Sequence, residues 1–138
     1  MECRLRGSTE AWSCQIYIRW EFDGDDQPVE TITEVPFGVR ITDKSLVERM
    51  LRRAQLAVLD SKTSKEHFID IDDDSLATLL ASTQVAPFSR NVVCIDLSGP
   101  GLPNLSFIDL PGTTHVCWDD VDLPLMAYLQ HCRYHPER

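Results

Sequence analysis

The sequence predicts an α/β domain, and three patterns carry this prediction. Residues 13–22 alternate apolar and polar side chains, which is the period of a strand that is buried on one face. Residues 43–59 carry apolar side chains at helical spacing. Residues 92–97 and 105–108 are short apolar runs, typical of strands that are buried on both faces of an α/β sheet. A chain of 138 residues has room for one modest domain of this class.

The first predicted element is an N-terminal hairpin. Residues 23–28 have the composition of a turn, and residues 29–35 form a β-branched stretch without clean alternation. We expect 13–22 and 29–35 to pair as antiparallel strands. The apolar face of the first strand consists of Cys14, Ile16, Ile18, Trp20 and Phe22.

The second predicted element is one long helix at 43–59. Thr42 or Asp43 can cap its first turn, and Ser45 with Glu48 fits a capping box. Its polar residues, Arg53 among them, are expected to face mostly away from the core. Its apolar face consists of Leu46, Val47, Met50, Leu51, Ala54, Ala57 and Val58.

The segment 60–86 is predicted to be a surface excursion. It mixes Ser and Thr with an acidic run at 70–74 and a short helical pattern at 75–81. The acidic run suggests calcium, but it lacks the D-x-[DN]-x-[DN]-G order and the distal Glu of a calcium loop. We therefore expect a solvated acidic loop.

The two apolar runs are joined by a stretch, 99–104, that is rich in Gly and Pro. This turn composition predicts that 92–97 and 105–108 are antiparallel neighbours. Near the C-terminus, residues 123–134 have the pattern of a short helix that Asp122 can cap.

The C-terminal segment also gathers several His and Cys residues, but neither a C-x₂-C pair nor a standard zinc-finger spacing is present. Cys117 and His115 can touch on an extended segment, yet the sequence supplies no orienting group or oxyanion site for a nucleophilic pair. Incidental residues are the expected explanation of both patterns. The residues concerned are His115, Cys117, His131, Cys132 and His135.

The formal net charge of −9 argues against a surface for nucleic acid, which requires clustered Lys and Arg. It also argues against docking on anionic lipid, and no apolar run is long enough for direct membrane insertion. Five cysteines at irregular spacing do not make a disulfide framework. We expect a reduced, cytoplasmic chain.

The most informative motif is Asp109-Leu110-Pro111-Gly112, at the end of the second apolar run. An Asp that ends a buried strand, followed three residues later by Gly, is the pattern with which GTPases sense a γ-phosphate. The carboxylate reaches Mg²⁺ through a water, and the Gly amide approaches the terminal phosphate. D-x-x-G alone is a weak pattern, and the two strand patterns that lead into it give it weight.

The region around this motif resembles the dynamin family of large GTPases, and within it the dynamin-like, Mx-type proteins of fungi. The specific part consists of FSRNVVCIDLSGP at 88–100 and PNLSFIDLPG at 103–112. The supporting segments are MECRL at 1–5, WEF at 20–22, VPFG at 35–38 and ITDKS at 41–45. The resemblance covers about 1–112, which is identified as a partial dynamin-type G domain, and 113–138 is a divergent tail.

The resemblance implies a partial P-loop GTPase sheet with GTP and Mg²⁺ as cofactors. It assigns nucleotide binding to Asp109, Leu110, Pro111 and Gly112, and water-mediated Mg²⁺ binding to Asp109. It implies that 105–108 pairs with 92–97 on one side and, in the family, with the P-loop strand on the other. Without that strand, 105–108 is expected to be an apolar edge, which the tail can cover.

The other parts of a GTPase site are not found in this sequence. No Lys follows Gly, as the P-loop requires, and no Lys follows Asn or Thr, as the guanine-specific [NT]-K-x-D motif requires. The P-loop amides and Lys supply most of the phosphate binding and charge stabilisation. We therefore expect the chain alone neither to bind nor to hydrolyse GTP.

Two alternatives remain beside the GTPase fragment. The chain can be a non-catalytic interaction fragment that pairs with a full-length dynamin-like GTPase, or a truncated gene product without an independent role. The membrane remodelling of the family depends on a helical stalk that has no counterpart here, and it is not transferred.

Overall fold

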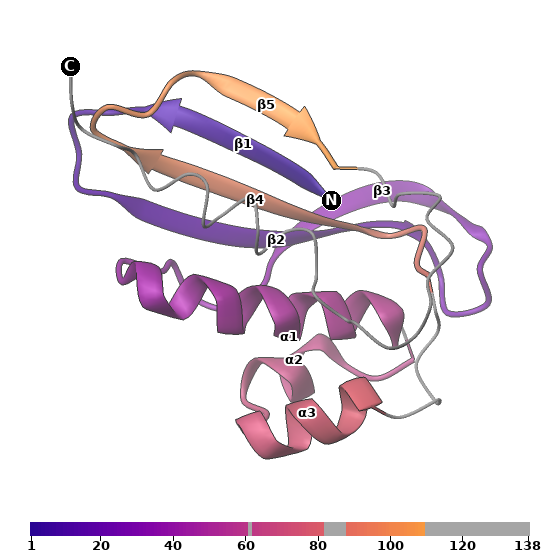
Figure 1. The fold of residues 1–138 in the computed structure, drawn as a ribbon. Helices are drawn as coiled ribbons and strands as arrows, with labels where there is room; N and C mark the ends of the chain where they lie inside the picture. The colour runs from indigo at the N-terminus through magenta and orange to yellow at the C-terminus, as the bar shows by residue number, and fades with distance from the viewer. Residues whose placement is uncertain (61, 82–87, 110–138) are drawn as a thin grey trace.

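The computed structural model describes residues 1–60, 62–81 and 88–109. In this part of the chain, one five-stranded sheet is packed on one side by helices (Figure 1). This mixed α/β architecture confirms the predicted fold class at its coarsest level. The tail at 113–138, including the predicted helix at 123–134, lies outside the described residues.

The strands of the sheet follow the order β3-β2-β4-β1-β5. Strands β1 and β4 are parallel, and the other three neighbouring pairs are antiparallel. The predicted hairpin is confirmed, because β2 and β3 pair directly, with Ile18 opposite Val35. The bounds are Glu2–Gly7 for β1, Ser13–Phe22 for β2, Pro28–Pro36 for β3, Val92–Gly99 for β4 and Leu105–Ile108 for β5.

The predicted long helix is also confirmed, with a short 3₁₀ turn before it. Asp43 caps the turn by accepting a hydrogen bond from the Ser45 backbone amide at 2.9 Å, which lowers the pKa of Asp43. The helix itself has no side-chain cap, so the expected Ser45–Glu48 capping box is absent. The turn is η1 (Lys44–Leu46) and the helix is α1 (Val47–Leu59).

The main core lies between α1 and one face of the sheet, which we call the covered face. Ile16 and Ile18 of β2 are fully buried there, and Leu51 and Leu56 of α1 are almost fully buried. The period-2 pattern of β2 and the 3.6-residue pattern of α1 thus meet in one apolar layer. Burying such side chains is the dominant favourable contribution to folding.

The segment 60–86 is more ordered than a surface excursion. It forms α2 (Lys65–Ile69) and α3 (Asp73–Ala81), and Phe68, Ile71 and Leu76 join the core. The expectation that Arg53 faces mostly away from the core is wrong, because this ordered segment packs over the Arg53 side chain and buries it.

Arg53 is buried beneath this segment, and its guanidinium donates hydrogen bonds to the backbone carbonyls of Ile69 and Ile71. It thereby ties the α2–α3 connection to α1. Helical periodicity alone does not reveal this contact, because the partners are backbone groups.

The prediction that 92–97 and 105–108 are adjacent strands is wrong. Strand β1 lies between β4 and β5, pairing with β4 in parallel and with β5 in antiparallel orientation. The connection from β4 to β5 therefore crosses the end of β1. Gly7 fits that crossing because a Cβ there would lie 2.6 Å from the Leu102 carbonyl oxygen, and its amide donates to Asn104 Oδ1 at 2.9 Å.

Burial on both faces, predicted for both apolar runs, holds only in part. Val93, Cys94 and Ile95 of β4 are buried, although Cys94 lies on the face away from α1. In β5, Leu105 is 51% exposed and Ile108 is 66% exposed. The reason is position, because β5 is at the edge of the sheet in the described part of the chain and α1 packs against β2 and β4.

Candidate functional site

Asp109 directly follows the last residue of β5, at the position that the GTPase pattern requires. Its backbone amide donates to the Met1 carbonyl at 2.7 Å, and its carbonyl accepts from the Met1 amine at 2.7 Å. These bonds continue the β1–β5 ladder by one pair, so the strand ends hold the Asp109 backbone in place. The Asp109 side chain is exposed. The other three predicted site residues, Leu110, Pro111 and Gly112, lie outside the described residues.

Asp109 fits one part of the role that the motif implies. An exposed carboxylate is a hard oxygen ligand of the kind that Mg²⁺ accepts, directly or through water. Among the described residues, however, no group of three or more His, Cys, Asp or Glu is arranged to hold a metal ion. Asp109 is therefore a single candidate ligand, and the described residues do not complete a metal centre around it.

Two of the lysines make contacts unrelated to phosphate binding. Lys44 places its ammonium 5.4 Å from the centre of the Trp12 ring, in a cation–π contact. Lys65 donates to the Pro36 carbonyl at 3.1 Å. Neither contact involves Asp109.

Among the described residues, the most extensive network of ion pairs lies on the open face of the sheet, opposite α1. We call it the ionic cluster. Arg19 pairs with Glu2 at 2.6 Å and with Glu34 at 3.0 Å. Arg4 pairs with Glu34 at 2.7 Å and with Asp96 at 3.0 Å. The members come from four strands and are Glu2, Arg4, Arg19, Glu34 and Asp96.

The ion pairs of the ionic cluster stabilise the charged forms of its side chains. Partial burial by itself would lower the pKa of Arg4, but the Glu34 and Asp96 carboxylates outweigh it and the pKa is raised. Burial likewise opposes ionisation of Glu34, but the hydrogen bonds from Arg4 and Arg19 hold its pKa below the usual range. Arg4 and Glu34 are therefore both charged at neutral pH, and neither is poised to exchange a proton.

Cys94 lies beneath this cluster and is fully buried. Burial raises the pKa of its thiol, which disfavours the reactive thiolate. Cys14 on the covered face is similar, and burial raises its pKa to about 12. Both cysteines act as small apolar side chains.

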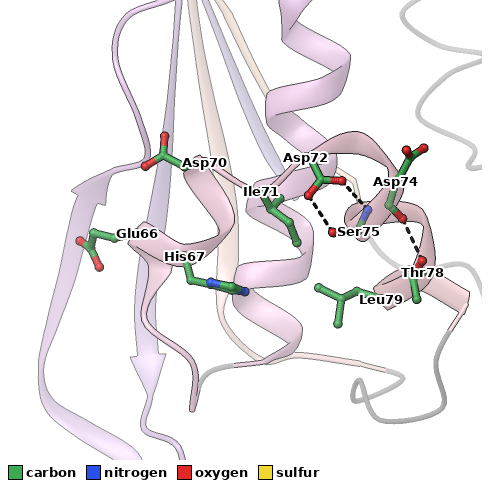
Figure 2. Close-up of a pocket in the computed structure, with 9 residues that line it drawn as sticks. All are labelled: Glu66, His67, Asp70, Ile71, Asp72, Asp74, Ser75, Thr78 and Leu79. Atoms are coloured by element: carbon green, nitrogen blue, oxygen red, sulfur yellow. Dashed lines mark hydrogen bonds between the residues drawn. The ribbon is translucent and has the colours of Figure 1, made fainter.

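The acidic run forms one wall of a groove between α2 and α3 (Figure 2). Asp72 caps α3, accepting from the Ser75 amide at 2.8 Å and from its hydroxyl at 2.7 Å, and the backbone bond lowers its pKa. Figure 2 shows the carboxylates of Glu66, Asp70 and Asp74 pointing away from Asp72. These carboxylates do not converge on a point where a cation can bind.

The ionic cluster is the feature that sequence reasoning missed. The signal was present, because β1 alternates Glu2, Arg4 and Arg6 with Cys3 and Leu5. A strand of six residues with charges on one face is easily mistaken for a surface segment. The His and Cys residues between His115 and His135, which were weighed for zinc binding and nucleophilic catalysis and expected to be incidental, lie outside the described residues.

Comparison with known proteins adds no further information about the site. No protein-family model, no curated protein and no solved structure matches this chain. Among the described helices, none is long and apolar enough to cross a bilayer.

Proposed function

We propose that this chain is part of the GTP-binding domain of a dynamin-like protein. In this proposal, Asp109, Leu110, Pro111 and Gly112 form the loop that responds to the γ-phosphate. The observation that carries the proposal is the position of Asp109, one residue past the end of β5 and bonded through its backbone to Met1. An Asp whose backbone is fixed at a strand end is what this type of switch requires.

Of the motifs that a GTPase needs, the 138 residues contain D-x-x-G but neither the P-loop nor the guanine-specific motif. In a complete site, Asp109 would help to hold Mg²⁺ through a water, and the Gly112 amide would donate to the terminal phosphate. Bound Mg²⁺ would neutralise charge between the phosphates. No P-loop and no guanine-specific motif occur in the 138 residues. The chain alone is therefore proposed to be inactive, and its activity belongs to a longer protein that supplies those motifs.

The coding sequence upstream of Met1 tests this proposal most simply. An in-frame G-x-x-x-x-G-K-[ST] motif there is the expected result, because it would supply the phosphate cradle. An in-frame stop codon upstream of Met1, with no P-loop encoded between that stop codon and Met1, would count against the GTPase proposal.

Where the longer protein exists, kinetics test the assigned role of Asp109. The variant Asp109→Asn should lower GTP hydrolysis at least tenfold and weaken its dependence on Mg²⁺, since the metal-held water loses its charged partner. Asp96→Asn is the matched control, because Asp96 pairs with Arg4 on the open face and is remote from the motif in the sequence. Equal effects of the two variants would remove Asp109 from the site.

The alternative is a non-catalytic interaction fragment that pairs with a full-length dynamin-like GTPase. The exposed side chains of β5 favour it, because an open sheet edge can accept a strand from another chain. Capture of a purified dynamin-like GTPase by the immobilised chain would support this alternative. Absence of capture would leave the first proposal as the better account.

A further inference from the structure

The open face of the sheet carries a groove beside the ionic cluster, which we call the open-face groove. Its volume is about 860 Å³, within the range of about 300–1,000 Å³ that is usual for small-molecule sites. In the described part of the chain, the helices pack on the other side of the sheet and leave this side uncovered (Figure 1). The groove is therefore a candidate binding site by position and size.

The register of the strands explains why the surface is hollow there. Arg6 of β1 lies opposite Ser98 of β4, and Ser98 lies opposite Ser13 of β2. Residues that are directly opposite in a sheet place their side chains on the same face. Two small serine side chains thus form a floor beside one long arginine, and all three residues line the groove.

Arg40 bounds the groove on the other side. Cys14 and Ile41 exchange both backbone hydrogen bonds at 2.8 Å, and both side chains are buried on the covered face. Because successive residues of an extended segment alternate between the faces, Arg40 is on the open side, beside Gln15. Arg6 and Arg40 therefore stand on opposite sides of the serine floor, with their backbones three strand spacings of about 4.8 Å apart.

The donors of this groove are not used by the described part of the chain. Arg6 and Arg40 are exposed, and neither forms an ion pair or a side-chain hydrogen bond with a described residue. The hydroxyls of the two floor serines also make no hydrogen bond to a described group. By contrast, Arg4 in the same groove is paired with Asp96 at 3.0 Å. Four donor side chains thus surround one hollow without a partner among the described residues.

The charges that line the groove favour an anion. Its arginines are Arg4, Arg6 and Arg40, and its carboxylates are Glu10 and Asp96. The other polar side chains of the lining are uncharged. With Asp96 paired to Arg4, Glu10 is the remaining carboxylate beside two unpaired arginines. The groove is therefore locally positive in a chain whose formal net charge is −9.

From this arrangement we infer that the open-face groove binds a phosphate-bearing small molecule, with Arg6 and Arg40 holding the phosphate from two sides. A guanidinium presents a planar fork of donors that matches phosphate oxygens, and the floor serines supply hydroxyl donors. Trp12 and Tyr17 also line the groove and offer ring surface to the rest of the molecule. Asp109 does not line it, so the inference does not depend on the proposed function.

Titration of the purified 138-residue chain with phenyl phosphate, at constant ionic strength, tests the inference. Amide signals in two-dimensional nuclear magnetic resonance spectra report both affinity and location. We expect saturable binding with a dissociation constant of about 1 mM or less, and the largest shifts near Ser13 and Ser98. Benzoate carries the same ring with a carboxylate and should bind about tenfold more weakly, because it offers less charge and fewer oxygens.

Two arginine variants test the residues named. Arg6→Gln and Arg40→Gln should each weaken phenyl phosphate binding by about tenfold or more, because each removes charged hydrogen-bond donors. Arg90→Gln is the matched control, since it changes the net charge equally while Arg90 is 61% exposed and does not line the groove. It should bind like the wild type. Far-ultraviolet circular dichroism confirms folding, and because both groove arginines are exposed, either variant can decide the matter alone.

Three results would overturn the inference. The first is the absence of saturable binding at millimolar phenyl phosphate. The second is an equal loss of affinity in Arg90→Gln and in the groove variants, because binding would then follow net charge and not a site. The third is binding of benzoate as tight as that of phenyl phosphate, since the groove would then not select a phosphate.

Discussion

The covered face and the open face of the sheet bury their side chains in different ways. Beneath α1, Ile16 and Ile18 exclude water through apolar packing. On the open face, Cys94 is equally buried, but beneath the ion pairs of Arg4 and Arg19. Burial on this sheet therefore does not by itself identify a hydrophobic layer, and the two faces should respond differently to mutation, salt and pH.

The largest effect is expected on the covered face. Ile16→Ala leaves a cavity beneath α1 and should lower the free energy of unfolding by about 3 kcal/mol, measured by urea denaturation. Ile32→Ala is the matched control, because Ile32 is exposed on β3, and it should change stability by less than about 0.5 kcal/mol. Similar losses for both variants would contradict the assignment of the core.

A smaller effect is expected where α1 meets the α2–α3 connection. Arg53→Met keeps most of the buried stem but leaves the Ile69 and Ile71 carbonyls without their donor, at a cost of about 2 kcal/mol. Arg52→Met is the control, because Arg52 makes an exposed pair with Glu48 at 3.0 Å worth about 0.3–0.5 kcal/mol. Equal losses in urea denaturation would show that the Arg53 contact is not formed.

The smallest effect is expected on the open face. Glu34→Gln weakens two partly exposed ion pairs and should cost at most about 1 kcal/mol at pH 7 and low salt. Salt should shrink this cost, because screening acts on partly exposed charges. A loss comparable to that of Ile16→Ala would mean that the open face carries as much stability as the core.

The pH dependence of the same variant provides a sharper test. The pKa of Glu34 is lower in the folded chain than its ordinary value of about 4.3, so its contribution is complete above that value. The contribution is lost as the pH falls through the folded-state pKa. The stability difference between wild type and Glu34→Gln should thus be constant near neutrality, shrink below the ordinary glutamate pKa and disappear once the pH is below the folded-state pKa of Glu34. If the stability difference between the two proteins instead grew on acidification, the pKa of Glu34 would be raised in the folded chain and not lowered.

The predictable part of the fold is the part that apolar periodicity encodes. Strand β2 was predicted from the two-residue spacing of Ile16 and Ile18, and helix α1 from the helical spacing of Leu51 and Ala54. The structure packs these side chains in one layer. The neighbour of β5 was predicted wrongly as β4, since a turn at 99–104 fits adjacent strands as well as strands with β1 inserted between them. The insertion depends on the long-range fit of Gly7 beneath Leu102, which no local pattern encodes.

The candidate site was predictable only as a motif. Local sequence placed Asp109 at a strand end, and the structure has it there. The ionic cluster was missed because its members are distributed over four strands, with Arg4 and Glu34 30 positions apart in the sequence. Such contacts follow from strand order, and strand order was the part of the fold that the sequence left open.

Titration of the purified 138-residue chain with a fluorescent GTP analogue in the presence of Mg²⁺ tests the central claim most directly. We propose that residues 109–112 form a loop that responds to a γ-phosphate, and that the 138 residues lack the P-loop that would bind that phosphate. We expect no saturable binding at micromolar nucleotide, and the same signal from Asp109→Asn as from the wild type. Micromolar affinity that Asp109→Asn abolishes would contradict it, because a complete nucleotide site would then exist in this chain.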